Sequence, residues 1–251
     1  MDLPELPAID ADALQQARID LAAALRAAAW LGLNEGVDNH FTARVPGTTD
    51  RYLINPKLHW SQITAGDVLI VDRSGRVVDG SRRPPMTGPN IHIPVHEAHP
   101  RGGCVFHVHA PWMTALTVTR GGRLEMCHQN ALRFFGDVAY DDDFNGFATA
   151  QEEGRRMAAA IGDKTILFLA NHGVLCVTET IAEGIDNLYY LERSCQLQIL
   201  GASTGKKLLV IEDAVARDAH QVLRGLMRGN AIAHFEQLKA ILARQEPHFA
   251  G

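Results

Sequence analysis

The chain has 251 residues, of which 46% are hydrophobic and 21% are charged. This length and composition are ordinary for one globular α/β domain. The formal net charge of −5 is mild and no long basic run occurs, so we expect no nucleic-acid partner. No apolar stretch approaches about 18 residues without a charge, so we expect no membrane span and no membrane partner.

The cysteines and the N-terminal segment favour a cytoplasmic protein. Residues 1–9 contain prolines and acids, and they lack the basic-then-apolar order of a signal peptide. The cysteines have no paired spacing, which fits reduced thiols in a cytosolic chain. They are Cys104, Cys127, Cys176 and Cys195.

The first third of the chain predicts one long helix followed by short strands. Asp10 is a suitable N-cap for a helix that runs to about Leu33, and Gly36 is predicted as its left-handed stop. Alternation and turn residues then predict strands over 40–45 and 52–55 and a hairpin over 68–78.

The next predicted helix follows a proline-rich loop and runs from Asn90 to Ala98. Pro94 fits this helix only in the first turn, where its missing N–H is not needed. The later predicted elements are a strand over 104–109, a helix over 111–119, a short strand over 138–139, a helix over 149–161, apolar runs over 165–170 and 173–177, a helix over 179–200, and helices from residue 212 with candidate breaks at Gly225 and Gly229.

Helices and strands alternate throughout, without an internal repeat or a low-complexity linker. We therefore predict the α/β class, with one three-layer domain. We assign residues 1–205 to a metal-binding domain and residues 206–251 to a helical C-terminal extension of the same domain.

Three histidines form a candidate metal site. His107 and His109 are alternate residues of a predicted strand, so both imidazoles point to the same face. His172 follows an apolar run and precedes a glycine, which permits a tight turn and a close approach of backbones. Neutral imidazole suits Zn²⁺, Fe²⁺ or Mn²⁺, and three protein ligands leave a position open, as in catalytic sites. An HxH motif alone also occurs by chance, so the pattern by itself leaves a structural role open.

Several segments, in this order along the chain, resemble the class II aldolase/adducin N-terminal domain family, and its bacterial adducin-like branch in particular. The segments are Glu35–Thr42, Leu53–Pro56, Ile63–Asp67, Cys104–Pro111, Asn171–Leu175 and Tyr189–Cys195. The resemblance implies a three-layer α/β/α fold with a central mixed, mostly antiparallel sheet. It implies that His107, His109 and His172 hold a divalent metal, zinc first. It also implies a homotetramer with active sites at subunit interfaces.

The chain departs from the sugar-phosphate aldolases of this family at functional positions. The acid/base glutamate of those enzymes stands four residues before the histidine that matches His92, where this chain has Gly88. Their phosphate-binding glycines and serines are replaced at Asn39–Thr42, Lys57–Leu58 and Met86–Thr87. We therefore expect a small substrate without a phosphate group.

Several residues are candidates for the remaining roles. His92 is the first candidate for the catalytic acid, because histidine titrates near neutral pH. Tyr140 lies near the segment that supplies a proton-donating tyrosine in the family's aldolases, offset by about two residues. The expected substrate-binding residues are His40, Asn39, Asn55, Lys57 and His128. A structural role is the alternative for each of them, and His96 and His99 are interpreted as solvent-facing helix residues.

These features favour a metal-dependent carbon–carbon lyase, an aldolase or a decarboxylase, acting on a small hydroxy or keto acid or a hydroxy-aromatic acid. One alternative is an Fe(II)-dependent oxygenase of aromatic acids, because three histidines can hold Fe²⁺ and still admit oxygen. The other alternative is a non-catalytic oligomerisation module like that of the adducins. Nothing in the sequence distinguishes the metals or names the substrate.

Overall fold

The computed structural model describes residues 10–251, so residues 1–9, in which we expected no signal peptide, lie outside the described residues. The α-helices are α1 (Ala11–Trp30), α2 (Gly88–Ala98), α3 (Pro111–Thr117), α4 (Gln151–Ile161), α5 (Ile181–Ala202) and α6 (Asp213–Gln245). The strands are β1 (His40–Arg44), β2 (Arg51–Ile54), β3 (Leu69–Asp72), β4 (Val77–Asp79), β5 (Cys104–Val108), β6 (Val138–Asp141), β7 (Ile166–Leu169) and β8 (Gly173–Thr178). Short 3-10 turns include η1 (Trp60–Gln62), η2 (Ala65–Asp67), η3 (Gln129–Phe134) and η4 (Pro247–Ala250).

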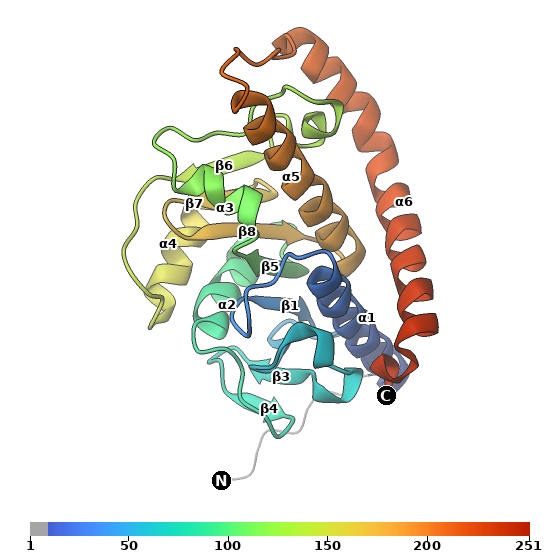
Figure 1. Cartoon of the computed structure of the whole chain (residues 1–251). Coiled ribbons are helices and arrows are strands. Elements are labelled where there is room, and N and C mark those ends of the chain that lie inside the picture. The colour runs from blue at the N-terminus through green and yellow to red at the C-terminus, as the bar shows by residue number, and fades with distance from the viewer. Residues whose placement is uncertain (1–9) are drawn as a thin grey trace.

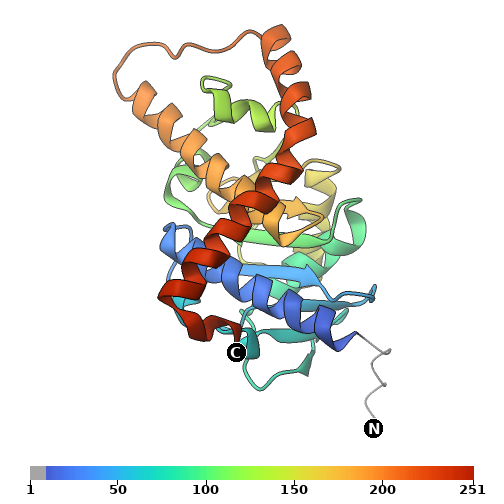
Figure 2. The same ribbon diagram turned by 90° about the vertical axis from the view of Figure 1, so that its right-hand side faces the viewer.

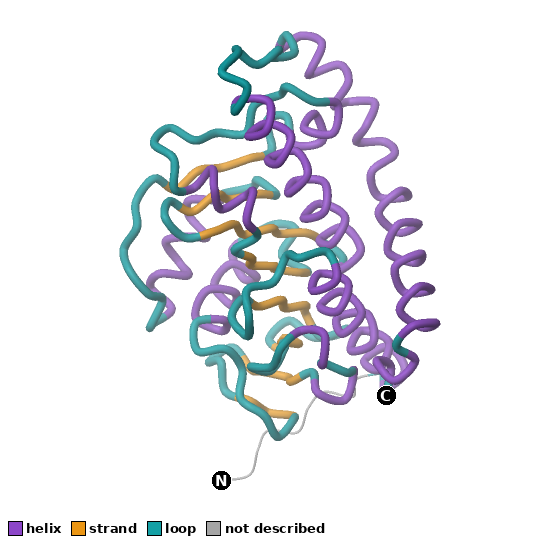
Figure 3. The backbone as a smooth tube through the Cα atoms, viewed as in Figure 1, coloured by secondary structure: helices purple, strands orange, loops and turns teal. Residues whose placement is uncertain are grey.

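Within the described range, the strands form one eight-stranded mixed sheet between two helical layers (Figure 1). The strand order is β4-β3-β2-β1-β5-β8-β7-β6, and each neighbouring pair is antiparallel except β6 and β7. The strands stack between helices on both sides of the sheet (Figure 3). This architecture confirms the predicted three-layer α/β/α fold with a mostly antiparallel sheet.

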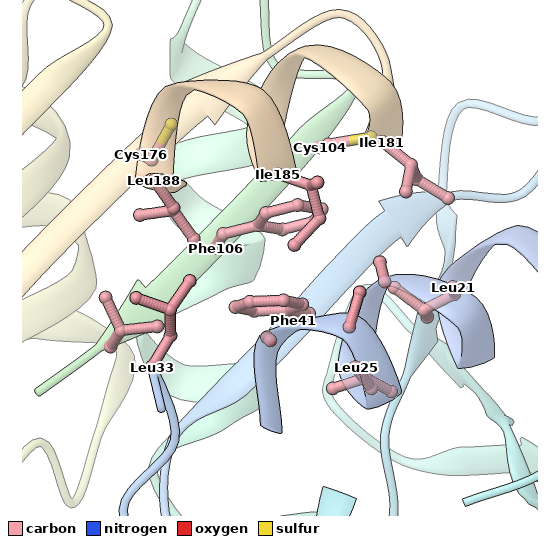
Figure 4. Packing of buried hydrophobic residues seen from close by; sticks show 14 of the residues in the cluster. Leu21, Leu25, Leu33, Phe41, Cys104, Phe106, Cys176, Ile181, Ile185 and Leu188 are labelled. Atoms are coloured by element: carbon pink, nitrogen blue, oxygen red, sulfur yellow. The ribbon is translucent and has the colours of Figure 1, made fainter. Parts of the chain in front are cut away.

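Successive side chains of β5 point to opposite faces of the sheet and therefore enter two different cores. Cys104, Phe106 and Val108 enter the large core beneath α1 and α5. There Phe106 stacks on Phe41 of β1, with 4.0 Å between the ring centroids (Figure 4). Val105 packs in a separate core with α2 and α4. His107, two residues further along β5, therefore faces the α2 and α4 side of the sheet.

The C-terminal helix α6 packs on the same core as the rest of the chain. It crosses α1 and α5 on the outer side of that layer (Figure 2). Its residues Phe235, Leu238 and Leu242 belong to the core that contains Phe41 and Phe106. The helix is continuous from Asp213 to Gln245, so the breaks considered at Gly225 and Gly229 do not occur.

Helix α1 ends earlier than predicted, because its stop is Gly32 and not Gly36. Gly32 has φ 73°, and its N–H donates to Ala29 O. Leu33 N–H donates back to Ala28 O, which completes the left-handed capping motif of a helix C-terminus.

Pro94 lies in the interior of α2, not in its first turn as predicted. Proline has no N–H, so the carbonyl of Asn90 one turn earlier receives no helical hydrogen bond from it. Gly154 of α4 packs directly on this carbonyl, where any Cβ would clash. In the described part of the chain, no helix is both long enough and apolar enough to cross a bilayer.

Candidate metal centre

The three predicted ligands come together at the C-terminal end of β5, a central strand of the sheet. His107 is on β5, His109 directly follows it, and His172 lies in the turn between β7 and β8. Strand β8 pairs with β5 in a register that sets Val174 opposite Val108. One ring nitrogen from each histidine lies within 4.8 Å of the others. His107 is buried, whereas His109 and His172 are partly exposed, so the cluster is open to solvent on one side.

The outer nitrogens of two of these rings are already occupied by acceptors. His107 Nδ1 lies 3.1 Å from Val174 O, and His109 Nδ1 lies 2.5 Å from Glu35 Oε2. A carbonyl and a carboxylate only accept, so both Nδ1 atoms carry the hydrogen of the neutral rings. Both Nε2 atoms therefore present lone pairs, and these atoms face each other at 2.9 Å. When both rings are neutral, these two lone pairs repel each other unless a proton or a metal ion lies between them. The donor set therefore fits a metal bound through Nε2 atoms.

The protonation of the cluster also suits a metal. Burial, with a smaller contribution from the neighbouring His109, lowers the pKa of His172 to about 4. Burial also lowers the pKa of His107 well below its usual value, with added repulsion from His172, His40, His109 and His92. Near neutral pH these rings are therefore neutral, which is the form that binds a metal.

Glu35 is a candidate functional residue that the sequence analysis missed. It belongs to a segment that carried the family resemblance, but it was given no role. Its carboxylate accepts a hydrogen bond from His109 Nδ1 and orients that ring. Its distance of 74 residues from His109 explains why sequence spacing did not connect the two.

His40 and His92 lie beside the triad but are buried and bonded to each other. His40 Nδ1 lies 2.8 Å from His92 Nε2, and the rings of His40 and His107 are 5.0 Å apart between centroids. His92 Nδ1 lies 2.7 Å from Thr42 Oγ1, so neither of its nitrogens is free. His92 is 0% exposed. Burial and these two partners leave His92 no nitrogen to present to a substrate, whereas we expected it to be the catalytic acid.

The interpretation of His96 and His99 as solvent-facing is wrong. His96 is 1% exposed and bonds both Thr42 Oγ1 and Gly102 O, each through one ring nitrogen. His99 is also buried, with Nε2 at 2.9 Å from Lys164 O. Burial lowers the pKa of His96 to about 3. Helix α2 packs on the sheet through its histidine-bearing face, which a pattern based on apolar residues does not detect.

Two of the expected substrate-binding residues shape the backbone near the triad. Asn39 has φ 71°, and its Oδ1 accepts from His109 N at 3.3 Å. Its Nδ2 is buried without a hydrogen-bond partner. Asn55 is fully buried, and its Oδ1 accepts from Phe41 N at 2.9 Å. Asn39 thus keeps a free donor, whereas the Asn55 amide is used by the fold.

The structure does not show the other expected residues in contact with the triad. Lys57 is exposed, with its Nζ 3.8 Å from Asp38 Oδ1. His128 is the N-cap of η3, and its Nδ1 accepts from Asn130 N. Tyr140 on β6 accepts a hydrogen bond at its hydroxyl from Leu124 N at 3.0 Å. The Arg123 guanidinium lies over the Tyr140 ring.

Comparison with known proteins decides the family. The model of the Class II Aldolase and Adducin N-terminal domain matches residues 19–199. The chain belongs to this family. The resemblance inferred from the sequence motifs is thereby confirmed.

Named members of the class II aldolase family are similar over most of the chain. Decarboxylase NovR of Streptomyces niveus is 34% identical over 74% of this chain and 69% of its own. A 4-hydroxy-3-prenylphenylpyruvate oxygenase/4-hydroxy-3-prenylbenzoate synthase of Streptomyces roseochromogenus subsp. oscitans is 34% identical over 73% of this chain and 67% of its own. The crystal structure of an aldolase II superfamily protein from Pseudomonas syringae superposes with a TM-score of 0.89 and 30% identity, over 96% of this chain and 98% of that one.

Proposed function

We propose that this protein is a divalent-metal-dependent carbon–carbon lyase that acts on a small non-phosphorylated hydroxy or keto acid or a hydroxy-aromatic acid. The observation that carries the proposal is the pair of Nε2 lone pairs of His107 and His109, which face each other beside His172. His107, His109 and His172 would hold a divalent cation there, which would supply Lewis-acid chemistry of the kind that serves both retro-aldol cleavage and decarboxylation. Zinc is the metal we expect, since imidazole nitrogen is among its preferred ligands, and Mn²⁺ or Fe²⁺ also suit the set.

The protein groups near the triad favour a substrate without a phosphate. At the start of α2, Met86 is 72% exposed and Gly88 brings no side chain. Lys57 is the cation that we expected to meet a negative group, and the neighbouring Asp38 carboxylate offsets its charge. One positive side chain beside an acid suits a single carboxylate better than a dianionic phosphate. The similarity to a protein named a decarboxylase agrees with this substrate class.

The proposal is tested by turnover with defined metals and substrates. Metal-free protein is loaded with Zn²⁺, Mn²⁺ or, without oxygen, Fe²⁺. Each form is then assayed with 4-hydroxyphenylpyruvate, 4-hydroxymandelate and a 4-hydroxy-2-keto acid. We expect metal-dependent release of CO₂ or of an aldehyde or keto fragment, and loss of this activity in His172→Ala. Absence of cleavage across the panel with a full complement of each metal would contradict the lyase proposal.

An oxygenase is the second candidate, because one relative that is 34% identical is named an oxygenase of a hydroxylated aromatic keto acid. The same histidine set can hold Fe²⁺ with positions open to oxygen and substrate. Oxygen uptake by the Fe²⁺ form during turnover of 4-hydroxyphenylpyruvate separates the two reactions. Stoichiometric uptake supports the oxygenase, and cleavage at an equal rate without oxygen supports the lyase.

We infer that the chain assembles as a homotetramer, which would bring residues of a neighbour toward each active site. The outer face of α6 supports an assembly, since Val215, Val222 and Leu226 are exposed along it. Size-exclusion chromatography with light scattering should give four times the chain mass. Val222→Asp and Leu226→Asp should lower that mass if this face is buried between subunits. A monomer in the wild type would contradict the inference and would also argue against an adducin-like assembly role.

We place the protein in the cytoplasm. All four cysteines are unpaired, and Cys104, Cys176 and Cys195 are buried. Burial raises the pKa of the Cys104 and Cys176 thiols, so these groups are unreactive. Thiol titration of protein purified without a reductant should recover four free thiols after unfolding.

A further inference from the structure

A hydrogen-bonded chain begins at a backbone carbonyl beneath α2 and leads toward the candidate metal centre. His96 Nδ1 lies 2.8 Å from Gly102 O, and His96 Nε2 lies 2.7 Å from Thr42 Oγ1. The carbonyl only accepts, so His96 carries its hydrogen on Nδ1. His96 is buried without a carboxylate partner, so it is neutral, and its Nε2 is a lone pair. Thr42 therefore donates its single hydroxyl hydrogen to His96.

The donor and acceptor roles at Thr42 determine those of the next two imidazoles, His92 and His40. Thr42 Oγ1 has given its hydrogen to His96, so it accepts from His92 Nδ1 at 2.7 Å. His92 Nε2 is then a lone pair, and it accepts from His40 Nδ1 at 2.8 Å. His40 Nε2 is in turn left as a lone pair, and the Thr87 hydroxyl lies 3.1 Å from it as a donor. Thr42 Oγ1 also lies 3.2 Å from Val105 O, and donation to either acceptor leaves a lone pair for His92 Nδ1–H. Each ring nitrogen in the chain has one partner, so the direction of the bonds from His40 to His92 and from His92 to Thr42 is the same in both cases.

His40, the last imidazole of this chain, lies next to the triad. His40 is opposite His107 in the register of β1 and β5, and the two ring centroids are 5.0 Å apart. Thr87 is only half-buried, so its hydroxyl is the member of the chain nearest to solvent. Its remaining lone pairs are free to accept a hydrogen bond from a substrate hydroxyl.

The His40 ring also fills the room that a side chain at position 88 would need. A Cβ added to Gly88 would lie 3.3 Å from His40 Cγ and 3.0 Å from Ile54 Cδ1. A side chain at this position would require both neighbours to shift by a few tenths of an ångström. In this chain His40 therefore occupies the place where the sequence analysis found no acid or base.

We propose that Thr87 and His40 are the proton-transfer pair of the reaction, and that His92, Thr42 and His96 are positioning residues that keep His40 Nε2 unprotonated. This inference rests on the proposed lyase function. The substrate hydroxyl beside the bond to be cleaved gives its proton to Thr87 Oγ1, while Thr87 gives its own proton to His40 Nε2.

The transfer is balanced by the return of the same proton. The electron pair of the broken O–H bond stays on the substrate oxygen and becomes the second bond of a carbonyl as the carbon–carbon bond breaks. The electron pair of the carbon–carbon bond stays with the other fragment. That fragment takes the proton back from His40 through Thr87, which restores both residues.

The direction of the chain can be measured without any substrate. In protein labelled with ¹⁵N-histidine, NMR should show His40, His92 and His96 as Nδ1–H tautomers, with or without zinc. Thr42→Val removes the acceptor of His92 Nδ1–H, so His92 and His40 should change to Nε2–H, while His96 stays Nδ1–H on Gly102 O. Thr42→Ser keeps the hydroxyl and should keep all three tautomers. An Nε2–H tautomer of His40 in the wild type, or unchanged tautomers in Thr42→Val, would overturn the proposal.

The catalytic part is tested with the substrate that the wild type cleaves. Thr87→Val and His40→Gln should lower kcat by about 10²- to 10⁴-fold, the usual contribution of general acid–base catalysis, at an unchanged metal content. Thr42→Val should lower kcat with little change in KM, and Thr42→Ser should restore it. Absence of wild-type turnover overturns the proposed function and the catalytic role together. Wild-type turnover with full activity in Thr87→Val and His40→Gln overturns the proton-transfer pair alone.

Discussion

The Nε2 atoms of His107 and His109 face each other at 2.9 Å, while the Nδ1 atoms of both rings bond acceptors outside the cluster. Strand β5 places the two rings side by side. The acceptors at the two Nδ1 atoms favour the Nδ1–H tautomers, in which the Nε2 atoms carry no hydrogen. A cation removes the resulting repulsion, so the native fold gains free energy when a metal binds.

This gain predicts a higher melting temperature in zinc. A ligand at about 100 times its Kd stabilises the native state by about 2.7 kcal/mol, which corresponds to a rise of roughly 5–10 °C for a chain of this size. His107→Ala and His172→Ala should abolish both the rise and metal uptake, as measured by scanning fluorimetry and elemental analysis. His220→Ala is the control, because this histidine lies on α6 and bonds Leu132 O. A full metal complement in either triad variant would show that the ligands are assigned incorrectly.

Glu35→Gln should weaken metal binding without removing a ligand. The carboxylate holds the His109 ring through Nδ1, and loss of such an outer partner typically costs 10- to 100-fold in metal affinity. A competition titration with a chromogenic chelator measures this change. Asp38→Asn is the matched control, since Asp38 is an exposed acid of the same loop and its ion-pair partner is Lys57. Equal affinities in the two variants would contradict an orienting role for Glu35.

The metal-free protein should lose stability as the pH falls, and His96 should contribute to this loss. Burial lowers the pKa of His96 from 6.5 to about 3 in the folded chain. Between these values the unfolded chain binds a proton that the folded chain does not, so the contribution is full above pH 6.5 and declines toward pH 3. One such group adds a slope of about 1.4 kcal/mol per pH unit. Urea unfolding at several pH values between 4 and 6 should therefore show a smaller slope in His96→Asn. The asparagine amide can still donate to Gly102 O, and an unchanged slope would contradict this account.

Two glycine substitutions should change stability in opposite directions. In Gly184→Ala on α5, the new methyl group would run into the ring of Phe106, which is stacked on Phe41. Such overpacking costs about 1–3 kcal/mol. Gly225 lies inside α6 with open space around it, so Gly225→Ala should stabilise the chain by about 0.4–1 kcal/mol. Urea unfolding curves measure both changes, and a stabilised Gly184→Ala variant would contradict the packing described for α5.

Sequence patterns predicted the structure correctly where the spacing of residues within one element determines which side chains share a face. The alternation of His107 and His109 predicted that their rings share one face, and the family resemblance added His172; ring nitrogens of all three lie within 4.8 Å of one another. The layers of the fold also followed from the alternation of helices and strands. The end of α1 was misplaced because Gly32 and Gly36 both offer a left-handed stop, and only the bond from Leu33 N to Ala28 O distinguishes them.

The polar interior could not be predicted in this way. His96 can be buried because Gly102 and Thr42, the latter 54 residues away in sequence, satisfy both of its nitrogens. A pattern of apolar residues treats histidine as polar and places it in solvent. Glu35 was missed because its partner His109 is 74 residues away, so no local pattern connects the two. Long-range hydrogen bonds decided each of these positions.

The contact between Gly154 and the carbonyl of Asn90 has a consequence for the helices on this side of the sheet. Pro94 leaves that carbonyl without its helical donor, and the absence of a side chain at position 154 lets one main chain touch the other. At this contact the spacing between α2 and α4 is set by two backbones, beside the core that their side chains form. A bulkier residue at position 154 would push α2 away from α4 and would therefore displace His92 and His96, which lie on α2.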